Sequence, residues 1–129
     1  MIALVATAGG TFAVDLESEE IAPAEEFEPA PAPSLNLPRV VAAAAVGSTV
    51  VAVVAARPPM LVSHDAGTTW RESGRGLPPG AAVAVGDWNP DVLAYGARNR
   101  LYVSLNGGLF WRALAVELPE IEALALRES

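Results

Sequence analysis

Short apolar segments, separated by residues that favour turns, run along most of the chain. Residues 40–46, 49–56 and 60–64 are rich in Val, Ala and other apolar residues, and the breaks between them contain Gly, Ser and Pro. Segments of this length and composition are typical of antiparallel strands joined by hairpins. A further segment at 69–72 completes a group of four. The pattern therefore predicts an all-β domain built from four-stranded units.

The same arrangement occurs again 41 residues further along the chain. Ser63 and Trp70 are matched at this spacing by Ser104 and Trp111, and neighbouring positions follow in step. A period of about 40 residues is typical of repeat architectures, in which each repeat is one small structural unit. The second copy predicts strands at 81–86, 92–97, 101–105 and 109–115.

A weaker copy lies at the N-terminus, where residues 2–8 and 11–16 resemble the second and third strands of the other copies. Its first strand is missing from this position. Residues 121–126 alternate as the start of a unit does, and they can supply that strand if they pair with residues 2–8. We therefore predict a single domain of three units: unit one over about 1–28 with 121–126, unit two over about 40–73, and unit three over about 81–116.

The two best copies share a motif at the turn before their last strand. Residues 63–70 have the pattern S-x-D-x-G-x-T-W, and residues 104–111 have a softer version of it. A short Asp or Asn side chain can accept backbone N–H bonds inside a tight turn, Gly can adopt a positive φ, and hydroxyl groups can satisfy the remaining backbone groups. Trp then packs the turn onto the sheet. We therefore expect a structural role, without catalytic or metal-binding chemistry, for Ser63, Asp65, Gly67, Thr69, Trp70, Ser104, Asn106, Gly108 and Trp111.

This motif resembles the Asp-box, also called the BNR repeat, of sialidases, sortilin-type receptors and photosystem II assembly factors. The strand, Asn-Pro turn and strand at 83–95 are similar to the segment that precedes such a box. The resemblance covers about residues 40–129 and extends more weakly over 1–18. It implies a β-propeller in which each unit is one blade. Residues 15–18 depart from the motif, so the hairpin of the first copy must be held differently.

Three blades are too few for a propeller ring, which typically contains about four to eight. Three units would leave two open hydrophobic faces, whereas two copies of the chain supply six blades. We therefore expect a homodimer that forms one six-bladed ring, with residues 121–126 closing the first blade of the partner. The alternative is that the chain is a fragment or one half of a larger assembly.

Composition narrows the functional classes. The chain has 129 residues and a net charge of −7, so we expect no nucleic-acid partner and no binding to an anionic membrane. It has no Cys and a single His, His64, which we interpret as a surface residue. A thiol nucleophile, a metal site and a His-based catalytic triad are therefore not expected. We also expect no cofactor.

Two further segments bear on location and partners. Residues 40–56 are short for a membrane span, and they align with residues 81–97, which contain Asp87 and Asp91. The N-terminus has no cationic leader, so we expect a cytoplasmic protein without a membrane partner. Residues 18–38 are rich in Glu and Pro, which favours an extended surface insertion that guards a sheet edge. The alternative for this insertion is an acidic tail that binds a protein partner.

A candidate ligand site lies in the connecting loops. In propellers of this type, the loops between the second and third strands and the loops between blades share one face, which would bring together four side chains suited to carboxylate or phosphate. These are Arg57, Arg75, Arg98 and Arg100. The competing interpretation is that these arginines form ion pairs with the acidic insertion, at Glu19, Glu20, Glu25 and Glu26.

A sialidase-like hydrolase would need three arginines on separate blades, a Tyr nucleophile and an acidic side chain. Tyr95 and Tyr102 are better explained by packing within strands, and the innermost strands offer only small apolar residues. We therefore expect a non-enzymatic propeller scaffold or protein-interaction module. The alternatives are a small-anion or glycan-binding propeller that uses the arginine-bearing loops, and a degenerate sialidase-like hydrolase.

Overall fold

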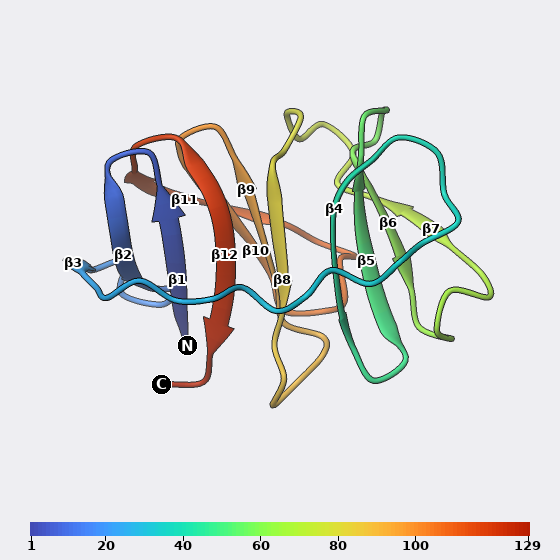
Figure 1. Ribbon diagram of the computed structural model, residues 1–129, viewed down its shortest axis with the longest axis horizontal. Coiled ribbons are helices and arrows are strands. Elements are labelled where there is room, and N and C mark those ends of the chain that lie inside the picture. The colour runs from blue at the N-terminus through green and yellow to red at the C-terminus, as the bar shows by residue number, and fades with distance from the viewer.

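The computed structural model describes residues 1–129 and consists of twelve strands and no helix (Figure 1). Sheet 1 contains β1 (Ile2–Thr7), β2 (Gly10–Asp15), β3 (Ile21–Pro23) and β12 (Ile121–Arg127). Sheet 2 contains β4 (Val40–Val46), β5 (Thr49–Val54), β6 (Met60–Ser63) and β7 (Arg71–Ser73). Sheet 3 contains β8 (Ala82–Val85), β9 (Leu93–Ala97), β10 (Arg100–Ser104) and β11 (Arg112–Glu117).

Every sheet is four-stranded and antiparallel, with the orders β12-β1-β2-β3, β4-β5-β6-β7 and β8-β9-β10-β11. This confirms the predicted all-β fold. The outer strands β7 and β11 begin later than the apolar pattern suggested, at Arg71 and Arg112. The reason is that residues up to 69 belong to the preceding turn, where Thr69 N–H donates to the Asp65 carboxylate at 2.8 Å.

Both ends of the chain contribute to sheet 1. β12 pairs with β1 from Ile2 opposite Arg127 to Thr7 opposite Ile121. We expected this strand to close a sheet of a partner, but the structure pairs it with β1 of its own chain. The cause lies in the short connection after β11, because Ile121 N–H donates to Arg98 O at 2.6 Å and starts β12 directly beside sheet 3.

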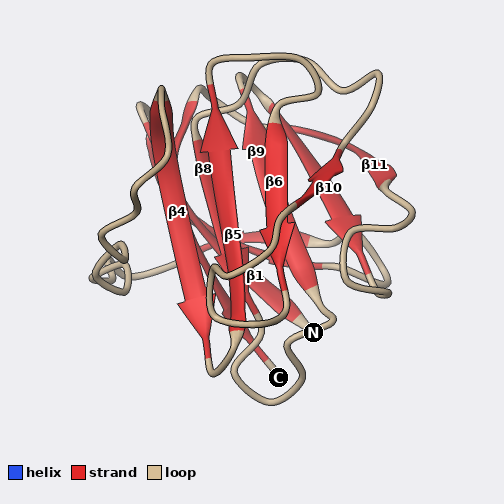
Figure 2. Cartoon of the chain, turned by 90° about the vertical axis from the view of Figure 1, so that its right-hand side faces the viewer, coloured by secondary structure: helices blue, strands red, loops and turns tan.

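Sheet 3 lies between the other two sheets, and the three innermost strands β4, β8 and β12 stand next to one another (Figure 1), with β8 in contact with both of its neighbours. Figure 2 shows the same arrangement from the side, as strands and loops alone. Two hydrophobic cores fill the spaces between the sheets. The core between sheets 1 and 3 includes Val5, Val14, Leu16, Leu101, Val103 and Leu114. The core between sheets 2 and 3 includes Val51, Val53, Met60, Leu93 and Tyr95.

The connection from β3 to β4, residues 24–39, crosses in front of the innermost strands to reach the far sheet (Figure 1). We call it the strap. Residues 25–38 of the strap make no hydrogen bond. Between the strap at Pro29, Ala30 and Ala32 and strands β4, β8 and β12 lies a cavity of about 460 Å³. The strap is therefore hydrogen-bonded only at its two ends, through Ala24 and Arg39.

Candidate functional site

The turn between β6 and β7 is closed by three polar side chains. Ser63 Oγ donates to Asp65 Oδ1 at 2.7 Å and accepts from Gly67 N–H at 2.8 Å. The Asp65 carboxylate also accepts from the hydroxyl and the backbone N–H of Thr69, at 2.6 and 2.8 Å. Ala66 and Gly67 have φ of 59° and 89°, a backbone conformation that favours glycine. The side-chain oxygens of Ser63, Asp65 and Thr69 thus form hydrogen bonds within the turn.

These hydrogen bonds explain the electrostatics of Asp65. The Thr69 hydroxyl, then the Thr69 N–H and then the Ser63 hydroxyl stabilise the carboxylate and lower the pKa of Asp65 to about 2. A carboxylate with a low pKa and saturated acceptors is unsuited to general acid or base work near neutral pH.

The turn between β10 and β11 repeats this geometry with an amide in place of the carboxylate. Ser104 Oγ donates to Asn106 Oδ1 at 3.0 Å and accepts from Gly108 N–H at 2.9 Å. Phe110 N–H donates to the same Asn106 oxygen at 3.0 Å. The amide oxygen can take the place of the carboxylate because the turn needs only an acceptor at this point.

The turn between β2 and β3 is held in another way. Asp15 Oδ1 accepts from the backbone N–H groups of Glu17 and Ser18, at 2.8 and 2.9 Å. The N–H of Ser18, followed by that of Glu17, lowers the pKa of Asp15. Glu19 then adopts a φ of 61° and returns the chain to β3. This is a local Asx-type turn, without the serine and tryptophan of the other two.

Two arginines on the outer strands connect the sheets, and we did not single them out from the sequence. Arg71 Nη2 of β7 donates to Gly107 O in the turn of sheet 3, at 2.9 Å. Arg112 Nη2 of β11 donates to Leu16 O in the turn of sheet 1, at 2.7 Å. The available signal was that an arginine follows the motif tryptophan in both copies.

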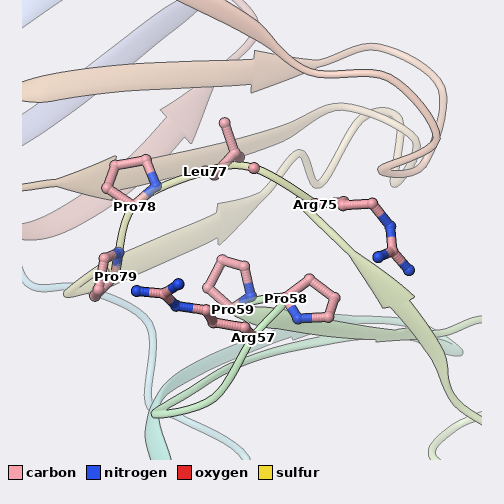
Figure 3. Close-up of a pocket in the computed structure, with 8 residues that line it drawn as sticks. Arg57, Pro58, Pro59, Arg75, Leu77, Pro78 and Pro79 are labelled. Carbon is pink, nitrogen blue, oxygen red and sulfur yellow. The ribbon is translucent and has the colours of Figure 1, made fainter.

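Of the four candidate arginines, two line the same hollow. Arg57 and Arg75 line a hollow of about 600 Å³ whose walls include Pro58, Pro59, Leu77, Pro78 and Pro79 (Figure 3). Figure 3 shows the two guanidinium groups on opposite sides of this hollow. Arg98 and Arg100 do not line it, and Arg100 forms an ion pair with Glu117 at 3.1 Å.

The ion pairs of the competing interpretation, between these four arginines and the acidic insertion, do not form. The ion pair that the insertion does make joins Glu19 to Arg112, at 3.4 Å. Glu19 also accepts from Ala115 N–H at 2.6 Å, so its carboxylate ties sheet 1 to sheet 3. Arg57 and Arg75 make neither an ion pair nor a hydrogen bond in the structure.

Tyr95 holds one wall of the hollow in place through Pro78. Its hydroxyl donates to Pro78 O at 2.6 Å, and its ring packs beside Trp111 and Tyr102, with centroids 6.1 and 6.0 Å away. Burial raises the pKa of Tyr95 to about 12, so its phenol stays protonated at neutral pH. Tyr95 is thus placed as a packing residue whose hydroxyl positions the 74–81 loop.

No three His, Asp or Glu side chains converge in a way that could hold a metal ion. The structure has no helix with the length and apolarity needed to cross a bilayer. His64 is exposed, with its Nδ1 atom 3.5 Å from the Thr49 hydroxyl. No protein family, no curated protein and no solved structure matches this chain.

Proposed function

We propose that the protein is a non-enzymatic β-propeller scaffold, and that its three sheets are the blades of a six-bladed ring formed by two copies of the chain. The observation that carries this proposal is the difference in burial between strands that hold the same place in different sheets. β8, the innermost strand of the middle sheet, is buried along its whole length. β4, the innermost strand of sheet 2, is exposed or half-buried, with Val41 53% exposed.

The second strands of sheets 1 and 3 show the same difference. β9 in the middle sheet is buried at every position, whereas β1 in sheet 1 alternates between half-buried and buried residues. Ala3 and Val5 pack toward sheet 3, and the half-buried Ile2, Leu4 and Ala6 face away from it. At sheet 2 the open end is β4, since β5 is buried throughout. Sheet 1 along β1 and sheet 2 along β4 therefore carry apolar surface that a further blade would cover.

Two copies related by a two-fold axis place sheet 1 of each copy beside sheet 2 of the other, so that no apolar sheet surface stays uncovered. Sheet 1 of one copy then packs on sheet 2 of the other, twice. The innermost strands would face a central channel, which the straps of the two copies would partly fill, since Pro29, Ala30 and Ala32 line the same cavity as β4, β8 and β12.

A non-enzymatic role is supported by the hydrogen bonds of the polar side chains, which all serve structural contacts. Ser63, Asp65 and Thr69 bond to one another inside a turn, and the hydroxyl of Tyr95 bonds to a backbone carbonyl. A nucleophile needs an adjacent base within hydrogen-bond reach. Neither the hydroxyls of this turn nor the Tyr95 hydroxyl has a neighbouring base that is free to accept its proton. A ring with loops on both faces is the form in which such a scaffold would present binding surfaces to a protein partner.

The proposal is tested by placing a charge on the open side of sheet 1. Leu4→Lys should abolish dimer formation while the circular dichroism spectrum stays that of a β protein, because Leu4 is half-buried on that side. Ala8→Lys, on the exposed loop after β1, is the matched control and should remain dimeric. Light scattering separates the outcomes, and equal masses for the wild-type protein and Leu4→Lys would contradict the proposed ring.

A second candidate function is the binding of a small anion at the hollow of Arg57 and Arg75. The observation that favours it is that two guanidinium groups without ion-pair partners line one proline-walled hollow in a chain of net charge −7. Calorimetric titration with citrate and inorganic phosphate tests it. Binding should disappear in Arg57→Ala and Arg75→Ala and persist in Arg98→Ala, and binding that is equal in all three variants would reject the hollow as the site.

A further inference from the structure

Neighbouring sheets are joined by the same contact at both junctions. In each case, an arginine on the outermost strand of one sheet donates to a backbone carbonyl in the turn before the outermost strand of the next. Arg71 reaches Gly107 O at 2.9 Å, and Arg112 reaches Leu16 O at 2.7 Å. At the first junction, Ser73 Oγ adds a bond to Gly108 O at 2.6 Å. The outermost strand and the turn are thus the two halves of one repeated junction.

Within the chain, one outermost strand and one turn are left without a partner. β7 and β11 each receive the turn of a neighbouring sheet, but β3 receives none. The turns of sheets 3 and 1 are each docked, but the turn of sheet 2 at residues 64–68 is not. Burial agrees with this: Gly107 and Gly108 are buried in the docked turn, whereas the corresponding Ala66 is exposed and Gly67 half-buried. The free strand and the free turn lie at opposite ends of the molecule, with sheet 3 between them (Figure 1).

We propose that β3 of one copy docks on the 64–68 turn of a second copy, and that β3 of the second copy docks on the same turn of the first. This inference rests on the proposed ring and names the surfaces that close it. The occupant is a second copy because the free turn has the backbone form that sheet 3 uses to dock on sheet 2, and β3 is the one outermost strand that is not already in such a junction. We call each of the two contacts a seam.

The seam lacks the arginine of the internal junctions. Arg71 lies opposite Val62, and Arg112 lies opposite Val103. The corresponding pair in sheet 1 is Ala22 opposite Ala13, so a methyl group stands where the other two sheets carry a guanidinium group. The carbonyl of Ala66 in the partner would then receive no charged donor. Each seam is therefore weaker than the two internal junctions, and the ring separates into intact halves before its blades separate.

The first test supplies the missing donor. Ala22→Arg should tighten the dimer by about tenfold per seam and about 100-fold for the two seams together, since a hydrogen bond from a charged donor contributes on this scale. Pro23→Arg is the matched control, because it adds the same charge on the same exposed strand with the side chain on the opposite face. Sedimentation equilibrium measures both dissociation constants. An equal change in both variants, or no change in Ala22→Arg, overturns the seam.

The second test locates the contact directly. The chain has no native cysteine, so only the introduced cysteines can react with the cross-linker. Ala22→Cys and Ala66→Cys are prepared separately and treated with a short bis-maleimide reagent. The mixture should give a covalent dimer, and each variant alone should not, because two-fold symmetry places the two copies of either position at different seams. A dimer by light scattering without a cross-link in the mixture would overturn the seam and leave the ring standing. A wild-type protein that stays monomeric would instead overturn the ring itself.

Discussion

Ser73 offers a test of how sheets 2 and 3 are held together. Its hydroxyl is buried, donates to Gly108 O at 2.6 Å and accepts from Trp111 Nε1 at 2.9 Å. Ser73→Ala removes both bonds and leaves the carbonyl of the buried Gly108 without its donor. The indole N–H of the half-buried Trp111 can recover water. An unpaired buried carbonyl together with one lost hydrogen bond should lower the free energy of unfolding by about 2–3 kcal/mol.

Urea unfolding followed by tryptophan fluorescence measures this change. At a fixed protein concentration, Ser73→Ala should unfold at lower urea with an unchanged slope, and its melting temperature should fall by about 6–15 °C for a chain of this size. Ser34→Ala is the matched control, because Ser34 is exposed on the strap and makes no hydrogen bond. A loss below about 0.5 kcal/mol in Ser73→Ala, within the range of ordinary surface substitutions, would refute the claim that this side chain couples the two sheets.

Three further predictions concern the turn, the loop wall and the strap. Gly80→Ala should lower the melting temperature strongly, because the added methyl group would overlap the ring of Tyr95; thermal circular dichroism measures this, and a wild-type melt would contradict it. The pKa of Asp65 is lowered to about 2, so its contribution to stability should be present above the unfolded pKa of about 3.8 and be lost as pH falls toward 2. Unfolding between pH 2 and 5 should show this loss in the wild-type protein and not in Asp65→Asn. Deleting eight strap residues, 28–35, should make the strap too short to join sheet 1 to sheet 2 of the same chain, so that two chains exchange sheet 1 and form an intertwined dimer. Cysteines introduced at paired positions of β1 and β12 should then form disulfides between two chains. Disulfides within single chains would contradict this prediction.

The local pattern predicted the strands because each sheet is built from short segments with apolar side chains, bounded by residues that favour turns. The repeat at 41 residues placed sheets 2 and 3, since corresponding residues occupy corresponding positions in both. Pairing of the C-terminal segment with β1 was predictable because sheet 1 otherwise lacks its innermost strand. Its closure within one chain was not, because that depends on the hydrogen bonds of Arg98 and Asn99 with the connection that starts β12.

The long-range contacts of the candidate sites were also beyond sequence reasoning. Arg57 and Arg75 line one hollow because the loops that carry them, at 55–59 and 74–81, lie on its two sides, and the sequence of neither loop has a periodic pattern that would predict this. Arg98 occupies the position in sheet 3 that Arg57 occupies in sheet 2, yet it does not reach the hollow. The path of the strap is set by where β3 ends and β4 begins, and its residues 25–38 form no hydrogen bond that a pattern could reveal.

The central claim is that two copies of this chain form one closed ring, and the native mass across a dilution series tests it most directly. We expect twice the chain mass of 13.3 kDa at high concentration, with dissociation into folded 13.3 kDa halves on dilution and no species above the dimer. A folded protein that stays at 13.3 kDa at every concentration would contradict the ring, because the apolar surfaces of β1 and β4 would then be stable in water without a second copy.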